Sequence, residues 1–301
     1  MTTTVRPLVT ERLSVLKLGG SVLRDDASYA SAARFLQTRL ALSQDERLVV
    51  IVSAQHGTTD QLLQEAMAIV GSRLSSEGRR EPPRSGGPSD LTNDALDLLW
   101  STGEVRSVAL LALHLQKIGV SAVPFNVHQT GLVACPEQGR GADAPTGTDV
   151  RPERLVAALA HARIVIVPGF LGISAGGTIR SLGRGGSDLT AVLLAAAARA
   201  HACELIKDVP GYFTADPHRR ADARPIQDLT FDEALAMADA GCDLVQRAAL
   251  AAADAAGLQL VIRSMNAAAP VTTVQASHNG KDCRHHGVRY QDDSRGPAVG
   301  A

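Results

Sequence analysis

The sequence has few aromatic residues and lacks any closely spaced pair of cysteines. Only 3% of its 301 residues are aromatic, and its four cysteines are scattered. They are Cys135, Cys203, Cys242 and Cys283. Without a Cys-x-x-Cys pair, the chain offers no support for a zinc site or a disulfide framework, and reduced thiols in a cytosol are the simplest interpretation. Because aromatics are scarce, Ala, Leu and Val must fill the core, which suits helices packed on a parallel sheet.

An excess of charge and a long apolar run are also missing. The formal net charge of -1 provides no long-range attraction to nucleic acid or to an anionic membrane. The longest apolar runs, near residues 163–173 and 189–200, are too short or too interrupted to span a bilayer. Residues 1–13 contain no apolar signal-peptide core. We therefore expect a soluble, cytoplasmic protein with neither a nucleic-acid nor a membrane partner.

Strand and helix patterns alternate along the chain. A short apolar run at residues 14–18 ends in two glycines and precedes a helical stretch at 27–42. A second buried-strand pattern at 47–52 precedes a helical stretch at 59–69. This order predicts an α/β fold with a parallel sheet covered by helices. The length allows one large domain or two lobes that share a core.

The later segments continue this alternation and suggest a domain at 1–275 followed by a polar tail at 276–301 that we expect to be disordered. Within the domain, a second lobe begins near residue 183, so the lobes are about 12–182 and 183–275. Glycine- and proline-rich loops are expected at 71–90 and 135–148. Further helices are predicted at 91–100, 107–118, 152–160, 188–200, 231–240 and 244–255. Further strands are predicted at 120–125, 164–167, 202–206 and 258–263.

Two glycine-rich segments have the chemistry of anion sites. In Lys17-Leu18-Gly19-Gly20-Ser21, glycines let the backbone approach a ligand and the lysine adds a compact positive charge, although a simple turn explains the segment equally well. Residues 183–188, Gly-Arg-Gly-Gly-Ser-Asp, precede a helix, where three glycines and a hydroxyl favour anion binding. There Arg184 could grip a carboxylate or a phosphate, whereas Asp188 by itself would only complement the helix dipole.

Three other segments carry weaker signals. Residues 207–217 follow a strand and are rich in turn formers, so an ordinary hairpin is the simpler alternative. Glu104, in a predicted loop at 101–104, could cap the following helix or bind an amine, and residues 52–59 contain hydroxyls that fit a helix N-cap. All five segments lie at strand ends or helix starts. Together they indicate a site for a nucleotide and a second anionic substrate.

From about residue 15 to 264 the sequence resembles the catalytic domain of aspartokinases, within the amino acid kinase family. The most specific stretches are 98–104, 183–188 and 207–217. Val52-Ser53-Ala54 followed by Thr59 and Asp60 is aspartokinase-like, whereas N-acetylglutamate kinases carry a histidine- and glycine-rich loop there. The segment at 17–21 matches the family generally, because aspartokinases usually have Phe where Leu18 stands.

The resemblance implies an α/β fold with an open, mostly parallel sheet sandwiched by helices in three layers and divided into two lobes. It also implies a function and a set of site residues. The first lobe would hold L-aspartate and the second ATP with Mg²⁺, and the β-carboxylate would be phosphorylated to 4-phospho-L-aspartate in a protein that is expected to form a homodimer. Lys17 would stabilise the transferring phosphoryl group, and Asp188 would orient the Lys17 side chain. The amino acid pocket would contain Ser53, Thr59, Glu104, Phe170, Arg184 and Ser187, with Arg184 on the α-carboxylate and Glu104 on the ammonium group. The nucleotide would contact Gly19, Gly20, Lys207, Asp208, Tyr212 and Arg219, and no metal site formed by the protein alone is expected.

The chain departs from the aspartokinase pattern in three places. Asp243 stands where relatives carry a lysine that contacts ATP, and His218 replaces an expected arginine. At about 5 Å and an effective dielectric constant of about 20, one such charge contact is worth roughly 3 kcal/mol, so we hypothesise that Lys207 or Arg247 compensates. The residues after 264 are too few for the paired regulatory domains of aspartokinases, so we expect no feedback inhibition by lysine or threonine.

These departures leave two alternatives to aspartate phosphorylation. One is a kinase of the same fold that acts on another small carboxylate. The other is a catalytically weak, ligand-binding paralogue, which Asp243 favours. The adjacent His285 and His286 in the polar tail are read as solvated rather than as metal ligands.

Overall fold

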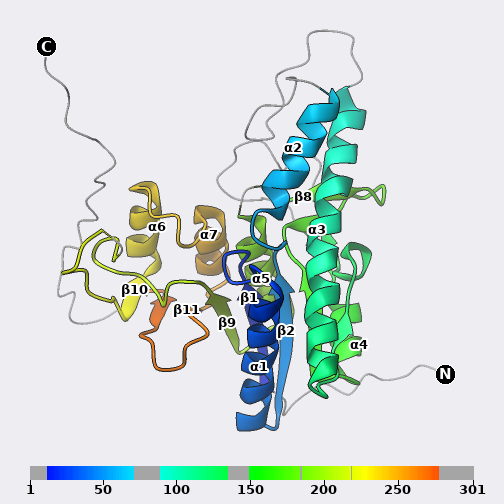
Figure 1. Ribbon diagram of the computed structural model, residues 1–301. Coiled ribbons are helices and arrows are strands. Elements are labelled where there is room, and N and C mark those ends of the chain that lie inside the picture. The colour runs from blue at the N-terminus through cyan, green and yellow to red at the C-terminus, as the bar shows by residue number, and fades with distance from the viewer. Residues whose placement is uncertain (1–11, 71–88, 135–148, 184, 218, 278–301) are drawn as a thin grey trace, which may run out of the picture.

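The computed structural model describes residues 12–70, 89–134, 149–183, 185–217 and 219–277 (Figure 1). In this part of the chain a large sheet has eight strands, in the order β10 (Asp228–Thr230), β12 (Thr272–Gln275), β11 (Leu260–Arg263), β9 (Ala202–Ile206), β1 (Arg12–Leu18), β2 (Glu46–Val52), β6 (Ile164–Pro168) and β3 (Val123–Pro124). All neighbours are parallel except β11 and β12. The predicted open, mostly parallel sheet is therefore confirmed.

Helices cover both faces of this sheet, which confirms the three-layer prediction. On one face lie α1 (Asp26–Leu42) and α3 (Ser89–Lys117), and α2 (Thr58–Val70) packs beside α3 (Figure 1). The other face packs against α4 (Glu153–Leu159), α5 (Gly186–Ala197), α6 (Phe231–Asp239) and α7 (Arg247–Ala255). A smaller sheet contains β5 (Asp149–Val150), β4 (Leu132–Val133), β7 (Leu171–Ile173) and β8 (Ile179–Ser181), with a short 3-10 helix η1 (Val127–Gln129) nearby.

The alternation of side chains along β1 divides the core into two clusters. Val15 belongs to the cluster under α5, whereas Leu16 and Leu18 belong to the cluster under α1 and α3. This period of two places every second residue of a central strand on the same face. Lys17, in register with Val15, therefore faces α5 rather than α1. None of the described helices is long and apolar enough to cross a membrane.

One predicted boundary is wrong in a way that matters for the site. The sequence pattern predicted two helices separated by a loop at 101–104, but α3 is one continuous helix through these residues. Glu104 lies inside α3 and therefore caps no helix. Gly103, which suggested the break, sits where a Cβ would lie 3.0 Å from Thr58 Cγ2 and 3.2 Å from Ala54 Cβ. The glycine is thus needed for close packing of α3 against the start of α2, not for a turn.

Several other predictions fall at the limits of the described structure. The strand predicted at 120–125 is reduced to β3, and the smaller sheet was not predicted, because two- and three-residue strands leave little pattern. Residues 71–88 of the loop predicted at 71–90 lie outside the described residues, and α3 begins at Ser89. The loop at 135–148 and the tail after residue 277 also lie outside them.

A buried ion cluster ties α1 to two strands of the sheet. Arg39 donates to both carboxylate oxygens of Glu46 at 2.8 Å and to those of Glu204 at 2.6 and 2.9 Å. Ser14 Oγ donates to Glu46 Oε1 at 2.6 Å. Burial alone would raise the pKa of Glu46, but these hydrogen bonds, with Arg39 first, outweigh burial and lower it. Arg39 therefore joins β2 and β9 across β1.

We predict that Arg39→Ala destabilises the fold by about 3 kcal/mol or more, because two buried carboxylates lose their cation. The Arg39-dependent stability of Glu46 exists above the ordinary pKa of a glutamate and disappears as pH falls through the lowered pKa. The loss should therefore be larger at about pH 6 than at about pH 3 in urea unfolding, because only the lower pH protonates Glu46 in the folded state. Arg34→Ala, an exposed arginine of the same helix, is the control. Equal losses at both pH values would contradict the prediction.

Candidate active site

Two lysines and one aspartate meet at the carboxyl edge of the sheet. Lys17 and Lys207 lie at the ends of the neighbouring parallel strands β1 and β9, and Asp188 lies in the first turn of α5. Lys17 Nζ is 2.8 Å from Asp188 Oδ1, and Lys207 Nζ donates to Asp188 Oδ2 at 2.7 Å. The carboxylate thus holds both ammonium groups in one place. Such strand ends are where open α/β sheets bind ligands.

Asp188 remains ionised despite complete burial. Burial by itself would raise its pKa, but the charges of Lys17 and Lys207 outweigh burial and lower the pKa to about 2. Burial lowers the pKa of Lys207, and the nearby Lys17 charge lowers it further, while Asp188 acts in the opposite direction. Asp188 is therefore an ionised carboxylate held between the side-chain nitrogens of two lysines, at 2.8 and 2.7 Å.

The predicted glycine turn after β1 packs directly against this cluster. A Cβ on Gly19 would lie 3.3 Å from Lys17 Nζ, and a Cβ on Gly20 would lie 2.9 Å from the carbonyl oxygen of Ala54. Glycine is therefore required at Gly20 for the close approach of two backbone segments. The turn brings its backbone beside a buried ammonium group, an arrangement suited to a phosphate.

Glu104 is buried beside the same cluster. It is 3% exposed, and among the described residues its Oε2 has no hydrogen-bond partner. Burial raises its pKa to about 8, although the Ala54 backbone N–H and the charge of Lys17 act to lower it. An unpartnered buried carboxylate is costly, and a cation from a ligand would offset that cost.

Phe170 occupies a strained position between β6 and β7. Its φ of 71° lies in the left-handed region that non-glycine residues rarely adopt. The surrounding structure holds it there, because its N–H donates to Thr190 Oγ1 at 3.1 Å and its ring meets Trp100 edge-on at 5.6 Å. The preceding Gly169 would place a Cβ 2.7 Å from Ser187 Oγ. The predicted pocket residues Phe170 and Ser187 are thus neighbours, and strain of this kind is frequent at functional sites.

The remaining predicted pocket residues follow β2 or precede α5. Ser53 directly follows β2, and its N–H donates to the Leu18 carbonyl at 3.1 Å, which places it beside the end of β1. Thr59 is half-buried in the first turn of α2. Arg184 lies outside the described residues, between Gly183 and Gly185, which both have positive φ.

A cavity of about 490 Å³ opens beside the lysine cluster. Two of the predicted nucleotide contacts, Lys207 and Asp208, line it. Ser21 Oγ donates to Asp208 Oδ1 at 3.0 Å, and Arg24 lies 3.5 Å from Asp208 Oδ2. Residues that the sequence reasoning missed complete the lining: Val22, Arg24, Pro210, Ser264, Met265, Asn266 and Ala269. Ser264 directly follows β11, so the rule that ligands bind beyond the ends of parallel strands could have identified residues 264–269 as part of the cavity.

Four predicted nucleotide contacts, Gly19, Gly20, Tyr212 and Arg219, are not among the residues that line this cavity. Tyr212 is 1% exposed, its N–H donates to Thr272 Oγ1 at 2.8 Å, and burial raises the pKa of its hydroxyl. Arg219 is exposed and lies 3.4 Å from Asp216. The neighbouring His218 lies outside the described residues.

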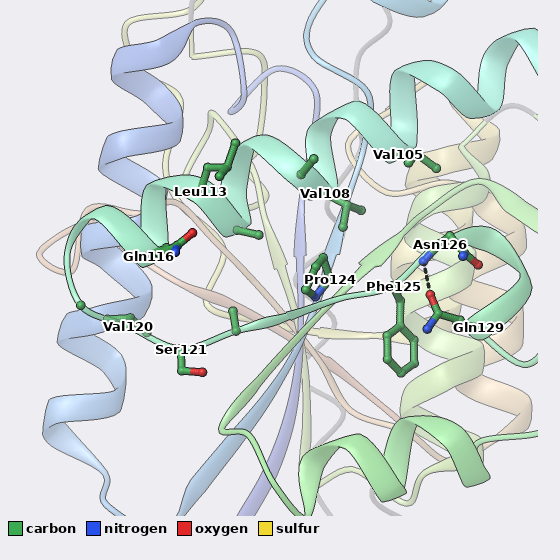
Figure 2. Close-up of a pocket in the computed structure, with 14 residues that line it drawn as sticks. Val105, Val108, Leu113, Gln116, Val120, Ser121, Pro124, Phe125, Asn126 and Gln129 are labelled. Atoms are coloured by element: carbon green, nitrogen blue, oxygen red, sulfur yellow. Dashed lines mark hydrogen bonds between the residues drawn. The ribbon is translucent and has the colours of Figure 1, made fainter.

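A second cavity, of about 830 Å³, lies against the other side of α3 (Figure 2). Figure 2 shows Val105, Val108 and Leu113 on α3 opposite the segment that carries Pro124 and Phe125. None of the predicted site residues lines this cavity. Its lining has no charged side chain.

The comparisons with known proteins agree with this geometry. A model described as the amino acid kinase family matches residues 12–264. The chain belongs to the amino acid kinase family. It is 36% identical to an aspartokinase of Thermus thermophilus over 264 residues, which make up 87% of this chain and 59% of that protein. It is 35% identical to an aspartokinase of Mycobacterium tuberculosis over 267 residues, or 88% of this chain and 58% of that protein.

Solved structures lead to the same family. An aspartate kinase from Synechocystis aligns with a TM-score of 0.69 at 30% identity, covering 89% of this chain and 40% of that one. The E. coli aspartokinase III structure with aspartate and ADP aligns with a TM-score of 0.67 at 24% identity, covering 89% of this chain and 66% of that one, and supports the fold. This amino acid kinase chain spans about three-fifths of the length of the two curated relatives.

Asp243 of this amino acid kinase lies in the loop between α6 and α7 and is exposed. The same loop reaches the glycine-rich turn, because a Cβ on Gly185 would lie 1.7 Å from Gln246 Cγ. Arg247, one of the two residues hypothesised to compensate for Asp243, donates to Asp239 Oδ1 at 2.7 Å. Lys207, the other, contacts Asp188 in the site.

We predict that Glu104→Gln removes a pH dependence of stability. The raised pKa of Glu104 means that its stabilising contribution is complete below the ordinary glutamate pKa and disappears as pH rises to about 8. From about pH 6 to 8 the wild type should therefore lose on the order of 2 kcal/mol relative to Glu104→Gln. Urea unfolding across this range is the measurement. Glu65→Gln, on the exposed side of α2, should show no such trend, and parallel curves for wild type and Glu104→Gln would refute the assignment.

Proposed function

We propose that this chain transfers the γ-phosphoryl group of ATP to the β-carboxylate of L-aspartate and forms 4-phospho-L-aspartate. The observation that carries the proposal is the Lys17–Asp188–Lys207 cluster, which places two fixed cations beside a glycine turn at the edge of the sheet. The aspartokinase relatives, at 35–36% identity, support aspartate as the acceptor.

The division of the domain into lobes is part of this proposal. Residues 12–182 would hold the amino acid, in a pocket that includes Ser53, Thr59, Glu104 and Phe170. Two residues of the second lobe would complete this pocket, Ser187 and Arg184, with Arg184 on the α-carboxylate. Residues 183–275 would supply most contacts to ATP. The cavity supports this division in part, because Lys207 and Asp208 line it together with Ser21 and Arg24 from the first lobe.

Glu104 would receive the ammonium group of the substrate. The buried carboxylate has an unpartnered oxygen and a raised pKa, so a cation that enters the pocket would stabilise its ionised form. Ammonium binding would therefore be coupled to loss of a proton from Glu104 below about pH 8. The same carboxylate would disfavour acids that lack an amino group, because these leave it without a cation.

The chemical step requires little more than positioning and charge. An oxygen of the β-carboxylate attacks the γ-phosphorus, and the bond from phosphorus to the β,γ-bridging oxygen breaks, with its electron pair leaving on ADP. No general base is needed, because the acceptor carboxylate has an ordinary pKa of about 4 and is already ionised. Lys17, held in place by Asp188, would offset charge on the transferring oxygens.

Mg²⁺ fits this site as an ion carried by the nucleotide. Among the described residues no three His, Cys, Asp or Glu side chains gather as a metal site. Mg²⁺ is usually bound through one or two carboxylates plus substrate phosphates, so it needs no such cluster of protein ligands. Asp208, an exposed carboxylate that lines the cavity, would be the contribution of the protein. The ion would supply charge neutralisation of the phosphates.

We predict aspartate-dependent ADP release by the purified protein with Mg-ATP, together with a hydroxamate when hydroxylamine traps the acyl phosphate. Lys17→Ala and Arg184→Ala should lower kcat/KM by about 100-fold or more, because each removes a fixed charge from the transition state or the substrate. Lys117→Ala, an exposed lysine at the end of α3, is the matched control. ATP binding without aspartate turnover would favour another small acid as acceptor, and absence of both would favour a non-catalytic paralogue.

We also predict that the KM for aspartate rises as pH falls below about 8, by up to about tenfold per pH unit, because Glu104 must lose its proton to bind the ammonium group. Initial rates between about pH 6 and 9 test this. In Glu104→Gln the KM should be high and independent of pH over that range. A KM that stays constant in the wild type would rule out Glu104 as the ammonium ligand.

The homodimer and the cytoplasmic location stay predictions. Light scattering on the purified protein would measure the first, and cell fractionation the second.

A further inference from the structure

Lys207 occupies a position from which it can reach both halves of the site. It follows β9, and its backbone N–H donates to the Arg263 carbonyl of β11 at 2.8 Å, so the main chain remains fixed beyond the strand end. Its side chain turns toward α5, where it meets Asp188. It also lines the 490 Å³ cavity. Lys207 is therefore the residue that connects the cavity with the Lys17–Asp188 pair.

Two lysines of the cluster share one buried carboxylate, and the other acids that act on them are Asp208, which is exposed, and Glu104, whose raised pKa favours its neutral form. The side chains of Lys17, Asp188 and Lys207 are only 9%, 3% and 11% exposed, and each oxygen of the single carboxylate already has its own lysine. Among the described residues, the second lysine has as its further counter-charge Asp208, whose exposed carboxylate is screened by water, which leaves a surplus of positive charge at the cluster. Such a surplus is unfavourable unless an anion completes it. The cavity beside Lys207 is open to an anion, so the surplus is located where a phosphate would enter.

We infer that Lys207 is a catalytic residue of the proposed reaction, whose ammonium group contacts the transferring γ-phosphoryl group together with Lys17, while Asp188 holds the two lysines in place. This inference rests on the proposed phosphoryl transfer. Lys207 donates no proton in the step. It offsets charge while the new bond from the carboxylate oxygen to phosphorus forms and the bond to the ADP oxygen breaks.

The same inference accounts for Asp243. The loop that carries it reaches the glycine-rich turn through Gln246, so a residue at 243 lies on an element that borders the site. Its charge is negative and exposed, and a second cation from β9 makes a lysine in this loop unnecessary. Arg247 is engaged with Asp239 at the start of α7, which leaves Lys207 as the better-placed of the two candidates.

The first test replaces Lys207 with a neutral residue of similar length. Lys207→Met should lower kcat by about 100-fold or more with the KM for aspartate within about threefold, whereas Lys207→Arg should retain part of the activity. Lys117→Met is the matched control. Thermal unfolding separates a catalytic role of Lys207 from a structural one. Lys207→Met leaves Lys17 and Asp188 as a neutral pair, so its unfolding temperature should be no lower than that of the wild type. A kcat of Lys207→Met close to that of wild type would overturn the inference while leaving the proposed function intact.

The second test measures nucleotide binding without turnover, by calorimetry with ADP and with the non-hydrolysable analogue AMP-PNP. Lys207→Met should lose about tenfold in affinity for AMP-PNP and much less for ADP, since only the former carries a γ-phosphoryl group. Adding Asp243→Lys to Lys207→Met should restore part of that affinity. If the wild type binds AMP-PNP but does not phosphorylate aspartate, the proposed acceptor fails and this comparison still decides the role of Lys207. Equal losses for both nucleotides, or no AMP-PNP binding by the wild type, would refute it.

Discussion

The carboxylate of Asp188 is the interaction around which the site is organised. It lies in the first turn of α5, fully buried, and pairs with lysines from two neighbouring strands. Without it, two ammonium groups would face each other in a site of low polarity, where their repulsion is strong. The first turn of a helix also favours a negative charge, so the helix dipole and the lysines stabilise the same ionised form.

Parallel strand order explains why these groups meet. β1, β2, β6 and β9 run in the same direction, so the segments after them emerge at one edge. The glycine turn at 19–20, Ser53, Phe170 and Lys207 all follow such strand ends. The ion cluster of Arg39 fixes the register of β2 and β9 on either side of β1, and so supports the placement of both lysines.

Much of this arrangement could be predicted from local patterns. Buried runs alternating with amphipathic stretches were sufficient for the sheet and its helical layers. Glycines beside a lysine or before a helix marked the two turns at which we propose that anions bind. The weaker predictions concerned short strands and the segment around Gly103. The glycine pattern at that position predicts the end of a helix, but Gly103 lies inside α3 and allows α3 to pack closely on α2. A local pattern does not record which distant helix a residue will touch.

The sequence by itself determined the fold class, the order of the elements, and the pairing of Lys17 with a glycine turn, because these depend on residues close together in the chain. Only the tertiary structure decided that Lys207 and Lys17 share Asp188 and that Tyr212 belongs to the core. It also decided that the side chain of Glu104, a residue of α3, is buried and that its pKa is raised. These features depend on burial and on charges brought together from distant segments. Neither quantity is defined until the chain has folded.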